Sequence, residues 1–374
     1  MTSAPIDFER LAQPGIQRLR AYDPGHDLVA LRRQHDAGRL IELGSNENPY
    51  GPSPQARAAI LDALHAIHRY PDPLGGDLKR ALAVRHGVAP EQVLLGNGSH
   101  ELLMQFAQVF AGPGVDVVAS QYGFAVYALA AQGAGAMLRI AGAFPREHAM
   151  AHGHDLDAIA DAVTATTRLV YVANPNNPTG TWFGAEAFAK FMSQLSGDVL
   201  VVIDEAYAEL ADPAEVASAL PLLARHPNLI VTRTFSKAYA LAGLRIGYAI
   251  AHSRLIAVME RVRESFNVNS LGLAAAEAAL GDTTHLQWVS ARNAEQRAAL
   301  TDTLRGRGLF VYPSQTNFLL VEFGPRSAGV EAALIAVGVV LRPMAGYGFP
   351  ECLRITVGDA SEIRRLLKAL DEVL

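Results

Sequence analysis

Residues 199–207 read VLVVIDEAY and residues 229–237 read LIVTRTFSK, so each segment is an apolar run that ends in polar side chains. Uninterrupted apolar runs rich in valine and isoleucine are typical of strands that are buried on both faces of a mainly parallel sheet. Strands of the same kind are predicted at 93–96 (VLLG), 115–119 (VDVVA), 169–173 (LVYVA) and 246–251 (IGYAIA). Together these runs predict one mainly parallel sheet at the centre of the fold.

The segments between these strands have the spacing of helices, as in 101–111 (ELLMQFAQVFA) and 185–195 (AEAFAKFMSQL). Alternating strands and helices indicate an α/β layer architecture. The chain beyond residue 253 segregates its strands from its helices, which is typical of a smaller α+β domain. There we expect helices at 253–281 (interrupted at 266–269), 285–306 and 360–373, and strands at 317–323, 339–342 and 352–357.

The chain is therefore expected to have three parts: an N-terminal arm (1–45), a large domain (46–265) and a small C-terminal domain (266–374). The arm has no long periodic run before residue 27. Because such a segment cannot bury a face of its own, we expect it to pack on the small domain or on a partner subunit.

The composition excludes several classes of protein. Of the 374 residues, 50% are hydrophobic and 18% are charged, which describes a globular chain and not a disordered one. The net charge of −5 comes without a basic stripe, which argues against a nucleic-acid or anionic-membrane binder. The single cysteine, Cys352, excludes a disulfide framework and fits a reducing compartment. We expect no secretory signal, no membrane-spanning segment and a cytoplasmic location.

Polar residues follow four of the predicted strands at the point where each strand ends. They are 96–99 (GNGS), 174–178 (NPNNP), 204–207 (DEAY) and 234–237 (TFSK). Ligands of open α/β sheets bind at the carboxyl ends of the strands. The sequence therefore predicts that these four segments form one binding site.

Lys237 decides the chemistry of that site. Only four of the chain's 32 basic residues are lysines, and Lys237 is the one that follows a predicted strand. An amine beside hydroxyls and an arginine favours Schiff-base chemistry over the usual solvated lysine. Thr234, Ser236 and Arg245 offer two hydroxyls and a guanidinium to a phosphate. The helix predicted after residues 96–99 would add its N-terminus to the same phosphate site.

Asp204 follows the apolar residues 200–203 and is expected to be at least partly buried. A buried carboxylate needs a cationic partner, which could be an arginine or the protonated ring nitrogen of a cofactor. Tyr207 and Asn177 could then donate to a phenolate oxygen on the same ring. A Schiff-base lysine, a phosphate site, a carboxylate for a ring nitrogen and phenolate donors together indicate pyridoxal 5′-phosphate.

On these residues the chain resembles the fold-type I pyridoxal-phosphate aminotransferases of the class II group, and among them the histidinol-phosphate aminotransferase family. The resemblance runs over nearly the whole length. It is carried by 22–25 (YDPG), 45–54 (SNENPYGPSP), 69–73 (RYPDP), 96–103 (GNGSHELL), 174–180 (NPNNPTG), 203–207 (IDEAY), 234–247 (TFSKAYALAGLRIG), 266–269 (FNVN) and 346–358 (GYGFPECLRITVG). It implies an α/β large domain with a mainly parallel seven-stranded sheet flanked by helices, a smaller α+β C-terminal domain and an N-terminal arm.

The resemblance also implies roles for single residues. Lys237, which would bind the cofactor and shuttle the substrate proton, is implied as catalytic together with Asp204 and Tyr207. The implied cofactor-binding residues are Ser99, His100, Phe124, Asn177, Asp204, Tyr207, Thr234, Ser236, Lys237, Arg245 and Tyr70. Tyr70 would reach the phosphate from the neighbouring subunit, which implies a homodimer with shared active sites. His100 departs from the family, which usually has an acidic residue there, and no metal is expected.

The implied reaction transfers an amino group between histidinol phosphate and 2-oxoglutarate by a ping-pong cycle, a step of histidine biosynthesis. The implied substrate-binding residues are Tyr22, Asn46, Arg342 and Arg354. Two arginines suit this reaction because glutamate brings carboxylates and histidinol phosphate brings a phosphate ester, and a guanidinium accepts either anion.

Three alternatives remain open from the sequence. An aromatic amino-acid aminotransferase acting on phenylalanine or tyrosine shares the cofactor chemistry and differs only in its pocket. A phosphothreonine decarboxylase-like lyase uses the same fold and lysine but breaks the bond between Cα and the carboxylate. A cofactor-binding protein without turnover is the third, and the retention of Lys237, Asp204 and Arg245 argues against it.

Overall fold

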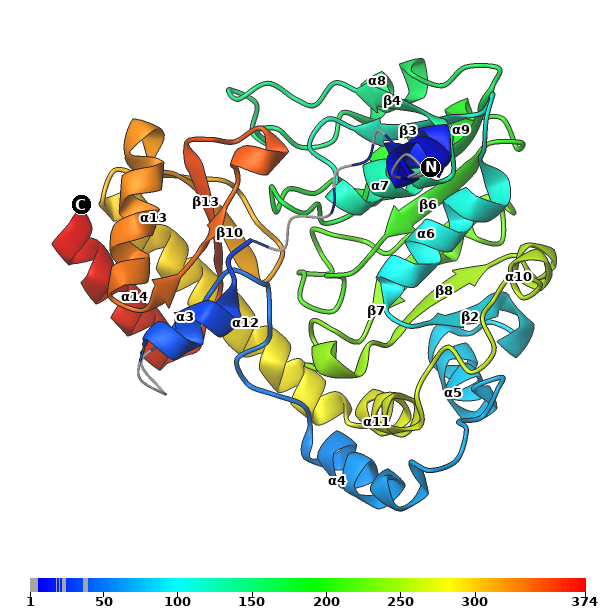
Figure 1. The fold of residues 1–374 in the computed structure, drawn as a ribbon, viewed down its shortest axis with the longest axis horizontal. Helices are drawn as coiled ribbons and strands as arrows, with labels where there is room; N and C mark the ends of the chain where they lie inside the picture. Colours follow the sequence, from blue (N-terminus) through cyan, green and yellow to red (C-terminus); the bar gives the residue numbers. More distant parts are fainter. Residues whose placement is uncertain (1–5, 18, 20, 22–24, 36–39) are drawn as a thin grey trace, which may run out of the picture.

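A seven-stranded sheet forms the centre of the larger part of the molecule (Figure 1). The computed structural model describes residues 6–17, 19, 21, 25–35 and 40–374. The strand order is β2-β8-β7-β6-β5-β3-β4, and all strands run parallel except β8, which is antiparallel to both of its neighbours. The strands are β2 (Val93–Gly96), β3 (Asp116–Ser120), β4 (Met137–Ala141), β5 (Thr167–Ala173), β6 (Leu200–Asp204), β7 (Leu229–Thr234) and β8 (Gly247–Ala251).

Helices cover both faces of this sheet because successive side chains of each strand point to opposite faces. One face packs on α6 (Ser99–Phe110), α7 (Ala125–Gly133) and α10 (Ser253–Met259). The other face packs on α8 (Leu156–Asp161) and α9 (Ala185–Gln194) over β3 to β7. At the β2–β8 end it packs on α5 (Gly76–His86) and α11 (Ser270–Gly281), with α4 (Pro54–Ala63) beside α11. The strand cores are therefore apolar throughout, as the sequence predicts.

The smaller part is built on the antiparallel sheet β12-β13-β10-β9, which lies beside the large sheet in Figure 1. Its strands are β9 (Phe310–Val311), β10 (Phe318–Glu322), β12 (Arg342–Pro343) and β13 (Cys352–Thr356). It shares one apolar core with α12 (Thr283–Gly306), α13 (Ser327–Ala336) and α14 (Ala360–Val373). A short parallel pair of β1 (Ile41–Glu42) and β11 (Val339–Val340) joins the end of the arm to this part.

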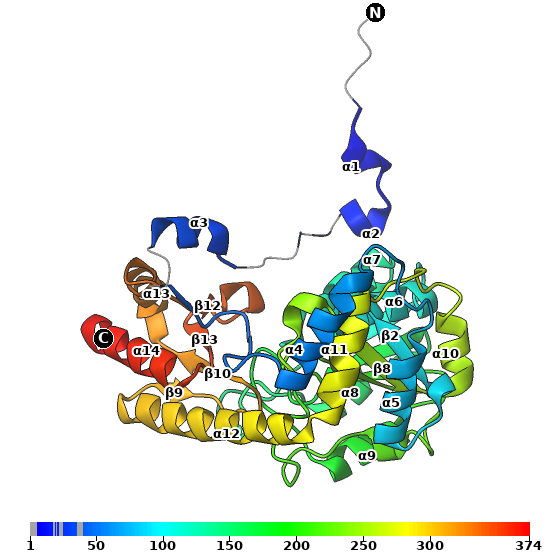
Figure 2. The same ribbon diagram turned by 90° about the horizontal axis from the view of Figure 1, so that it is seen from below.

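The N-terminal arm contributes three short helices. They are α1 (Phe8–Leu11), α2 (Pro14–Gln17) and α3 (Leu28–Gln34). Figure 2 shows α1 and α2 projecting beyond α7, which α2 contacts, while α3 lies over the smaller part. The domain limits at residues 45 and 265 stay a prediction, and α11, which comes after the second limit, packs on α4 (Figure 2).

Three sequence predictions differ from the structure. The edge strand β4 was not predicted, because two of its large apolar side chains, Met137 and Ile140, are exposed and the strand lacks a buried run. The helix predicted over 253–281 is interrupted at 266–269 as expected, but the interruption is longer, because α10 already ends at Met259; Phe266 in the connection has a left-handed backbone (φ 60°). The strand predicted at 339–342 is divided, since β11 pairs with β1 and β12 pairs with β13.

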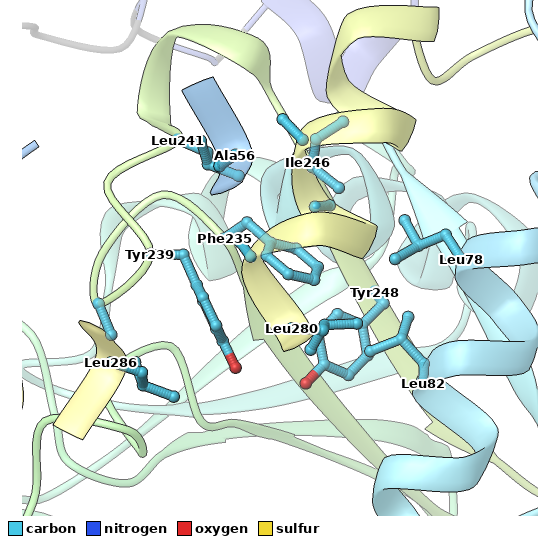
Figure 3. Close-up of a cluster of buried hydrophobic side chains, with 14 of the residues drawn as sticks. Ala56, Leu78, Leu82, Phe235, Tyr239, Leu241, Ile246, Tyr248, Leu280 and Leu286 are labelled. Carbon is cyan, nitrogen blue, oxygen red and sulfur yellow. The ribbon is translucent and has the colours of Figure 1, made fainter. Parts of the chain in front are cut away.

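One apolar cluster anchors the chain on both sides of Lys237 (Figure 3). Phe235 is fully buried, and its ring lies 4.8 Å from the ring of Tyr239 and 5.7 Å from that of Tyr248. Phe235 thus precedes the lysine by two residues and Tyr239 follows it by two. The backbone that carries the lysine is therefore fixed by the core and not by the site itself.

Candidate active site

A cavity of about 340 Å³ opens where β5, β6 and β7 end. All of the predicted site residues except Tyr22 and Tyr70 line it. They are Asn46, Ser99, His100, Phe124, Asn177, Asp204, Tyr207, Thr234, Ser236, Lys237, Arg245, Arg342 and Arg354. Tyr22 lies outside the described residues. The strand ends, the start of α6, the arm and the small antiparallel sheet thus meet at one place.

The N-terminus of α6 forms a close cradle for an anion. Gly98 has φ +81°, and a Cβ there would lie 2.6 Å from an Nη atom of Arg245. A Cβ on Gly247 would collide with the backbone nitrogen of Ser99. Glycine at these two positions therefore lets the helix N–H groups and the Arg245 guanidinium face the same space. Thr234 and Ser236, which the sequence predicts as hydroxyl donors to a phosphate, line the same cavity.

Asp204 ends β6 and is buried on the cavity wall. Tyr127 donates its hydroxyl to one carboxylate oxygen (3.0 Å) and Thr232 donates to the other (3.3 Å). Burial raises the pKa of Asp204 to about 6, against these two hydrogen bonds, which lower it. Such a carboxylate is best satisfied by a cationic group in the cavity, and a protonated ring nitrogen is one.

Lys237 lies half-buried in the cavity, with its amine directed to the arm. Its Nζ donates to the backbone carbonyl of Asn46 (3.1 Å). Burial lowers the pKa of Lys237 to about 8, and the positive charges of Arg354 and Arg245 lower it further, while Glu47 opposes them. An appreciable share of the amine is then neutral near neutral pH, as a nucleophile requires.

The two predicted substrate arginines come from neighbouring positions of the small antiparallel sheet, where Arg342 is the register partner of Arg354. Both are buried. Arg354 donates to the side-chain oxygen of Asn177 (2.7 Å) and to the carbonyl of Gly44 (2.8 Å). The guanidinium of Arg342 lies against Gly25 of the arm. A second cavity, of about 610 Å³, borders the first at Phe124, Tyr127 and Arg342.

Comparison with known proteins agrees with this geometry. Residues 39–370 match the family model for aminotransferase class I and II. Histidinol-phosphate aminotransferase 2 of Pseudomonas aeruginosa is 48% identical over 370 residues, which cover 98% of this chain and 99% of that protein. The chain belongs to the class I and II aminotransferases, in the histidinol-phosphate aminotransferase family.

Solved structures show the same fold for this aminotransferase. Histidinol-phosphate aminotransferase from Sinorhizobium meliloti, in complex with pyridoxal-5′-phosphate, has a TM-score of 0.86 and 34% identity, with 97% of each chain covered. Aspartate aminotransferase from Thermus thermophilus with maleate has a TM-score of 0.83 at 22% identity, covering 97% of this chain and 99% of that one. The second likeness supports the fold alone.

Among the predicted site residues that the structure describes, Tyr70 is the one that does not line the cavity of its own chain. Its side chain is 82% exposed, and its ring stacks on Phe266 with the centroids 4.5 Å apart. His100 does line the cavity, where burial and then Arg245 lower its pKa and so favour the neutral ring. The next residue, Glu101, accepts from the backbone N–H of Asn97 (2.6 Å) and closes the loop before α6.

Tyr127 is the residue of this site that the sequence analysis missed. It lies on α7 one turn after Phe124, and its ring stacks parallel to that of Tyr171 at 5.0 Å. A helix-spaced aromatic residue is usually an ordinary core side chain, and Tyr127 is indeed fully buried. Only its hydroxyl, which holds Asp204, makes it part of the site. Its spacing of three residues from Phe124, which places both side chains on one face of a helix, is the sequence feature that could have indicated its place in the site.

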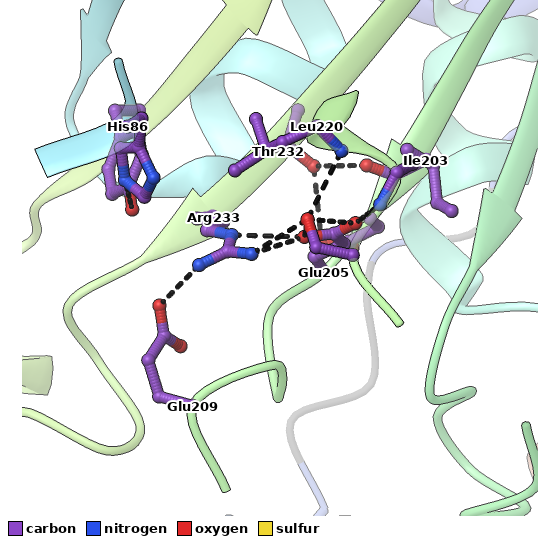
Figure 4. A network of polar contacts seen from close by, with 11 residues as sticks. His86, Ile203, Glu205, Glu209, Leu220, Thr232 and Arg233 are labelled. Carbon is purple, nitrogen blue, oxygen red and sulfur yellow. Dashed lines mark hydrogen bonds and ion pairs between the residues drawn. The ribbon is translucent and has the colours of Figure 1, made fainter. Parts of the chain in front are cut away.

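Behind the site, a buried ion-pair network joins the ends of β6 and β7 (Figure 4). Arg233 donates to Glu205 (2.6 Å) and to Glu209 (3.2 Å). Glu205 also accepts from Ser218 (2.8 Å) and from the backbone N–H of Ala219 (2.6 Å). Because Glu205 directly follows Asp204 and Arg233 directly precedes Thr234, the network fixes the two strand ends that carry site residues.

Within the described residues, the aminotransferase has no group of three histidine, cysteine, aspartate or glutamate side chains that could hold a metal ion. None of its described helices combines the length and the apolar character that crossing a membrane requires.

Proposed function

We propose that the chain is a pyridoxal 5′-phosphate-dependent aminotransferase that transfers an amino group between histidinol phosphate and 2-oxoglutarate. The observation that carries the proposal is the meeting of Lys237, Asp204 and the glycine-lined cradle at α6 in one cavity. The names of the relatives support the substrate, and the S. meliloti structure supports the cofactor. A cytoplasmic location stays a prediction.

The residues present fit the proposed cofactor at both of its ends. Ser99, Thr234, Ser236 and Arg245 would hold its phosphate, and Asp204 would hold its ring nitrogen. Tyr207 and Asn177 would face its phenolate oxygen, and Phe124 would stack on its ring. When bound, pyridoxal 5′-phosphate supplies an electron sink for the charge that develops at the substrate Cα.

Lys237 would hold the cofactor and then serve as the base that moves the substrate proton. Its lowered pKa leaves part of the amine neutral at the working pH, so that the amine can accept this proton. Asp204 must be ionised to keep a ring nitrogen protonated. A cation in the cavity favours that ionised form, although burial, opposed by the hydrogen bonds to Asp204, leaves its pKa raised to about 6.

Arg354 and Arg342 would bind the anionic group of each substrate in turn. The guanidinium of Arg354 is already held by Asn177 and Gly44, which presets its plane. A planar fork accepts a carboxylate of glutamate and the phosphate ester of histidinol phosphate by the same pair of hydrogen bonds. This explains how one site could serve both halves of the reaction.

The test is kcat/KM for histidinol phosphate beside phenylalanine and tyrosine, each with 2-oxoglutarate as acceptor. We expect histidinol phosphate to be the best substrate by at least about tenfold, because its phosphate ester can engage both arginines, whereas an aromatic amino acid offers them only one carboxylate. If kcat/KM for an aromatic amino acid were equal to or higher than that for histidinol phosphate, the proposed substrate would be wrong, but the assignment as an aminotransferase would stand. Release of carbon dioxide without amino transfer would favour the lyase.

We also propose a homodimer with shared sites. Tyr70, predicted to act at a partner's phosphate site, is largely exposed within its own chain. Exposed apolar side chains of the same segment, Leu64, Ile67 and Leu74, surround it in sequence. A surface of this composition is typical of an interface between subunits.

A further inference from the structure

Asn46 makes more contacts with the proposed catalytic groups than a loop asparagine needs for its own turn. It lies shortly after β1, at the start of the predicted large domain, is 2% exposed and has a left-handed backbone (φ 56°). Asparagine tolerates that conformation better than most residues do. The position therefore favours asparagine before any contact of the side chain is considered.

The backbone of Asn46 is held by the small antiparallel sheet. Its N–H donates to the hydroxyl of Thr356 (2.9 Å), which ends β13. Its carbonyl accepts from the side-chain amide of Asn317 (3.0 Å), just before β10. The same carbonyl accepts from the amine of Lys237 (3.1 Å). One peptide unit thus connects the small antiparallel sheet to the lysine.

The side chain of Asn46 decides which way the Tyr207 hydroxyl points. The amide nitrogen of Asn46 donates to the Tyr207 oxygen (3.0 Å). The amide oxygen is assigned by its contact with the Thr356 hydroxyl (3.4 Å). Because Tyr207 accepts from Asn46, its own proton has to be donated elsewhere. Tyr207 lines the cavity, so the hydroxyl is left free to donate to a group bound there.

We propose that Asn46 is a positioning residue that sets the Tyr207 hydroxyl as a donor into the cavity and ties Lys237 and Tyr207 to the small antiparallel sheet. The inference rests on the proposed cofactor. It gives Asn46 a different role from the predicted contact with substrate, because its amide and its carbonyl are both engaged by the protein.

The proposal has a spectroscopic consequence. A hydrogen bond donated by Tyr207 would draw charge away from the phenolate oxygen of the bound cofactor and would lower the pH at which the visible absorbance of the cofactor changes. Loss of the donor should raise the pH midpoint of the visible absorbance change of the bound cofactor. The charged groups that face the lysine, which are Glu47, Asp204, Arg245 and Arg354, stay unchanged in every variant below.

The experiment is a double-mutant cycle on the cofactor-loaded protein with Asn46→Gly and Tyr207→Phe. Glycine suits the left-handed backbone, keeps the carbonyl and adds no charge. We expect each single variant to raise the midpoint by about one pH unit, the size of a lost hydrogen bond to a charged oxygen. The double variant should have the midpoint of Tyr207→Phe alone, because Asn46 acts through that hydroxyl.

Asn293→Ala is the matched control, since Asn293 is also buried and, among the described residues, its amide donates to the backbone carbonyl of Thr316 alone. It should lower the thermal midpoint and leave the absorbance midpoint in place. Thr356→Val, which loosens Asn46 without altering it, should move the absorbance midpoint in the same direction as Asn46→Gly.

Two results would overturn the inference: an unshifted midpoint in Asn46→Gly, or shifts of equal size with and without the Tyr207 hydroxyl. If the wild-type chain develops no visible band with pyridoxal 5′-phosphate, the proposed cofactor fails instead. The two failures are therefore distinguishable.

Discussion

At the scale of single residues, Asp204 shows a conflict between function and stability. Its carboxylate is buried with two hydroxyl donors, and burial raises its pKa to about 6 from the ordinary value of 3.8. Between these two values the folded chain binds a proton that the unfolded chain releases, so stability falls as pH rises through this window. Above about pH 6 the cofactor-free protein carries the full cost of the buried charge.

Asp204→Asn should therefore stabilise the cofactor-free protein at pH 7.5, by roughly 2 kcal/mol, and change little at pH 4. The same substitution removes the proposed partner of the cofactor's ring nitrogen, so turnover should fall by at least about a hundredfold. Urea denaturation at the two pH values and steady-state rates measure both effects. A variant that is less stable than wild type at pH 7.5 would contradict the assigned burial cost.

Single residues also show where the sequence sufficed and where it did not. Asp204 and Lys237 were predictable because each directly follows an apolar run, and the end of a buried strand is a definite place in the fold. Tyr127 was not, since its helical spacing fits a core residue and nothing in it reports the direction of the hydroxyl. The roles of the arginines of β12 and β13 could be predicted only from the family resemblance, because local periodicity does not show which distant strands pair with each other.

At the scale of elements, the α6 cradle depends on the close approach of β8. A Cβ on Gly247 would collide with the backbone of Ser99, whereas a Cβ on Gly243 would meet nothing within 4 Å. Gly247→Ala should weaken the binding of pyridoxal 5′-phosphate by about tenfold or more, because the N-terminus of α6 has to move. Absorbance titration measures the Kd, with Gly243→Ala as the matched control. Equal Kd values for the two variants would show that the α6 cradle does not contribute to binding of pyridoxal 5′-phosphate.

The pairing of β6 with β7 depends in turn on the Arg233 network. Removing a buried charge leaves its partners uncompensated, which costs more than the pair itself contributes. Arg233→Leu should therefore lower the free energy of unfolding by about 3 to 5 kcal/mol. Arg292→Leu breaks an exposed pair with Glu295 and should cost less than about 1 kcal/mol. Similar losses for both variants in urea denaturation would show that burial does not matter here.

The way each strand pairs and packs also explains which strand limits the sequence predicts well and which it does not. Six of the seven strands of the large sheet are predicted to within two residues because their buried runs stop sharply. Strand β4 escaped notice because an edge strand buries only part of its side chains, and its residues lack a continuous apolar run. The division of 339–342 into β11 and β12 follows from two different partners, and partners are a property of the folded chain.

At the scale of the whole molecule, a complementation experiment tests the proposed homodimer with shared sites. Under this proposal Lys237→Ala should disable the chain's own site, whereas Tyr70→Ala should disable the site of its partner. A mixed dimer of the two variants then contains one site that is intact in both respects. Random mixing should restore roughly a quarter of the wild-type rate, since half of the dimers are mixed and each has one good site. No recovery after subunit exchange would place Tyr70 outside the partner's site.

The anchoring of Phe235 and Tyr239 in the core bears on how a newly made chain matures. Because the segment around Lys237 is held by apolar packing on both sides, and this packing involves no cofactor, we expect the segment to keep its shape when no cofactor is bound. The cofactor would then bind to a preorganised site, and no disordered loop would have to become ordered when it binds. Calorimetry of loading should accordingly give only the small heat-capacity change of filling a cleft, far below that of coupled folding. We therefore expect the newly made chain to fold completely before it binds pyridoxal 5′-phosphate.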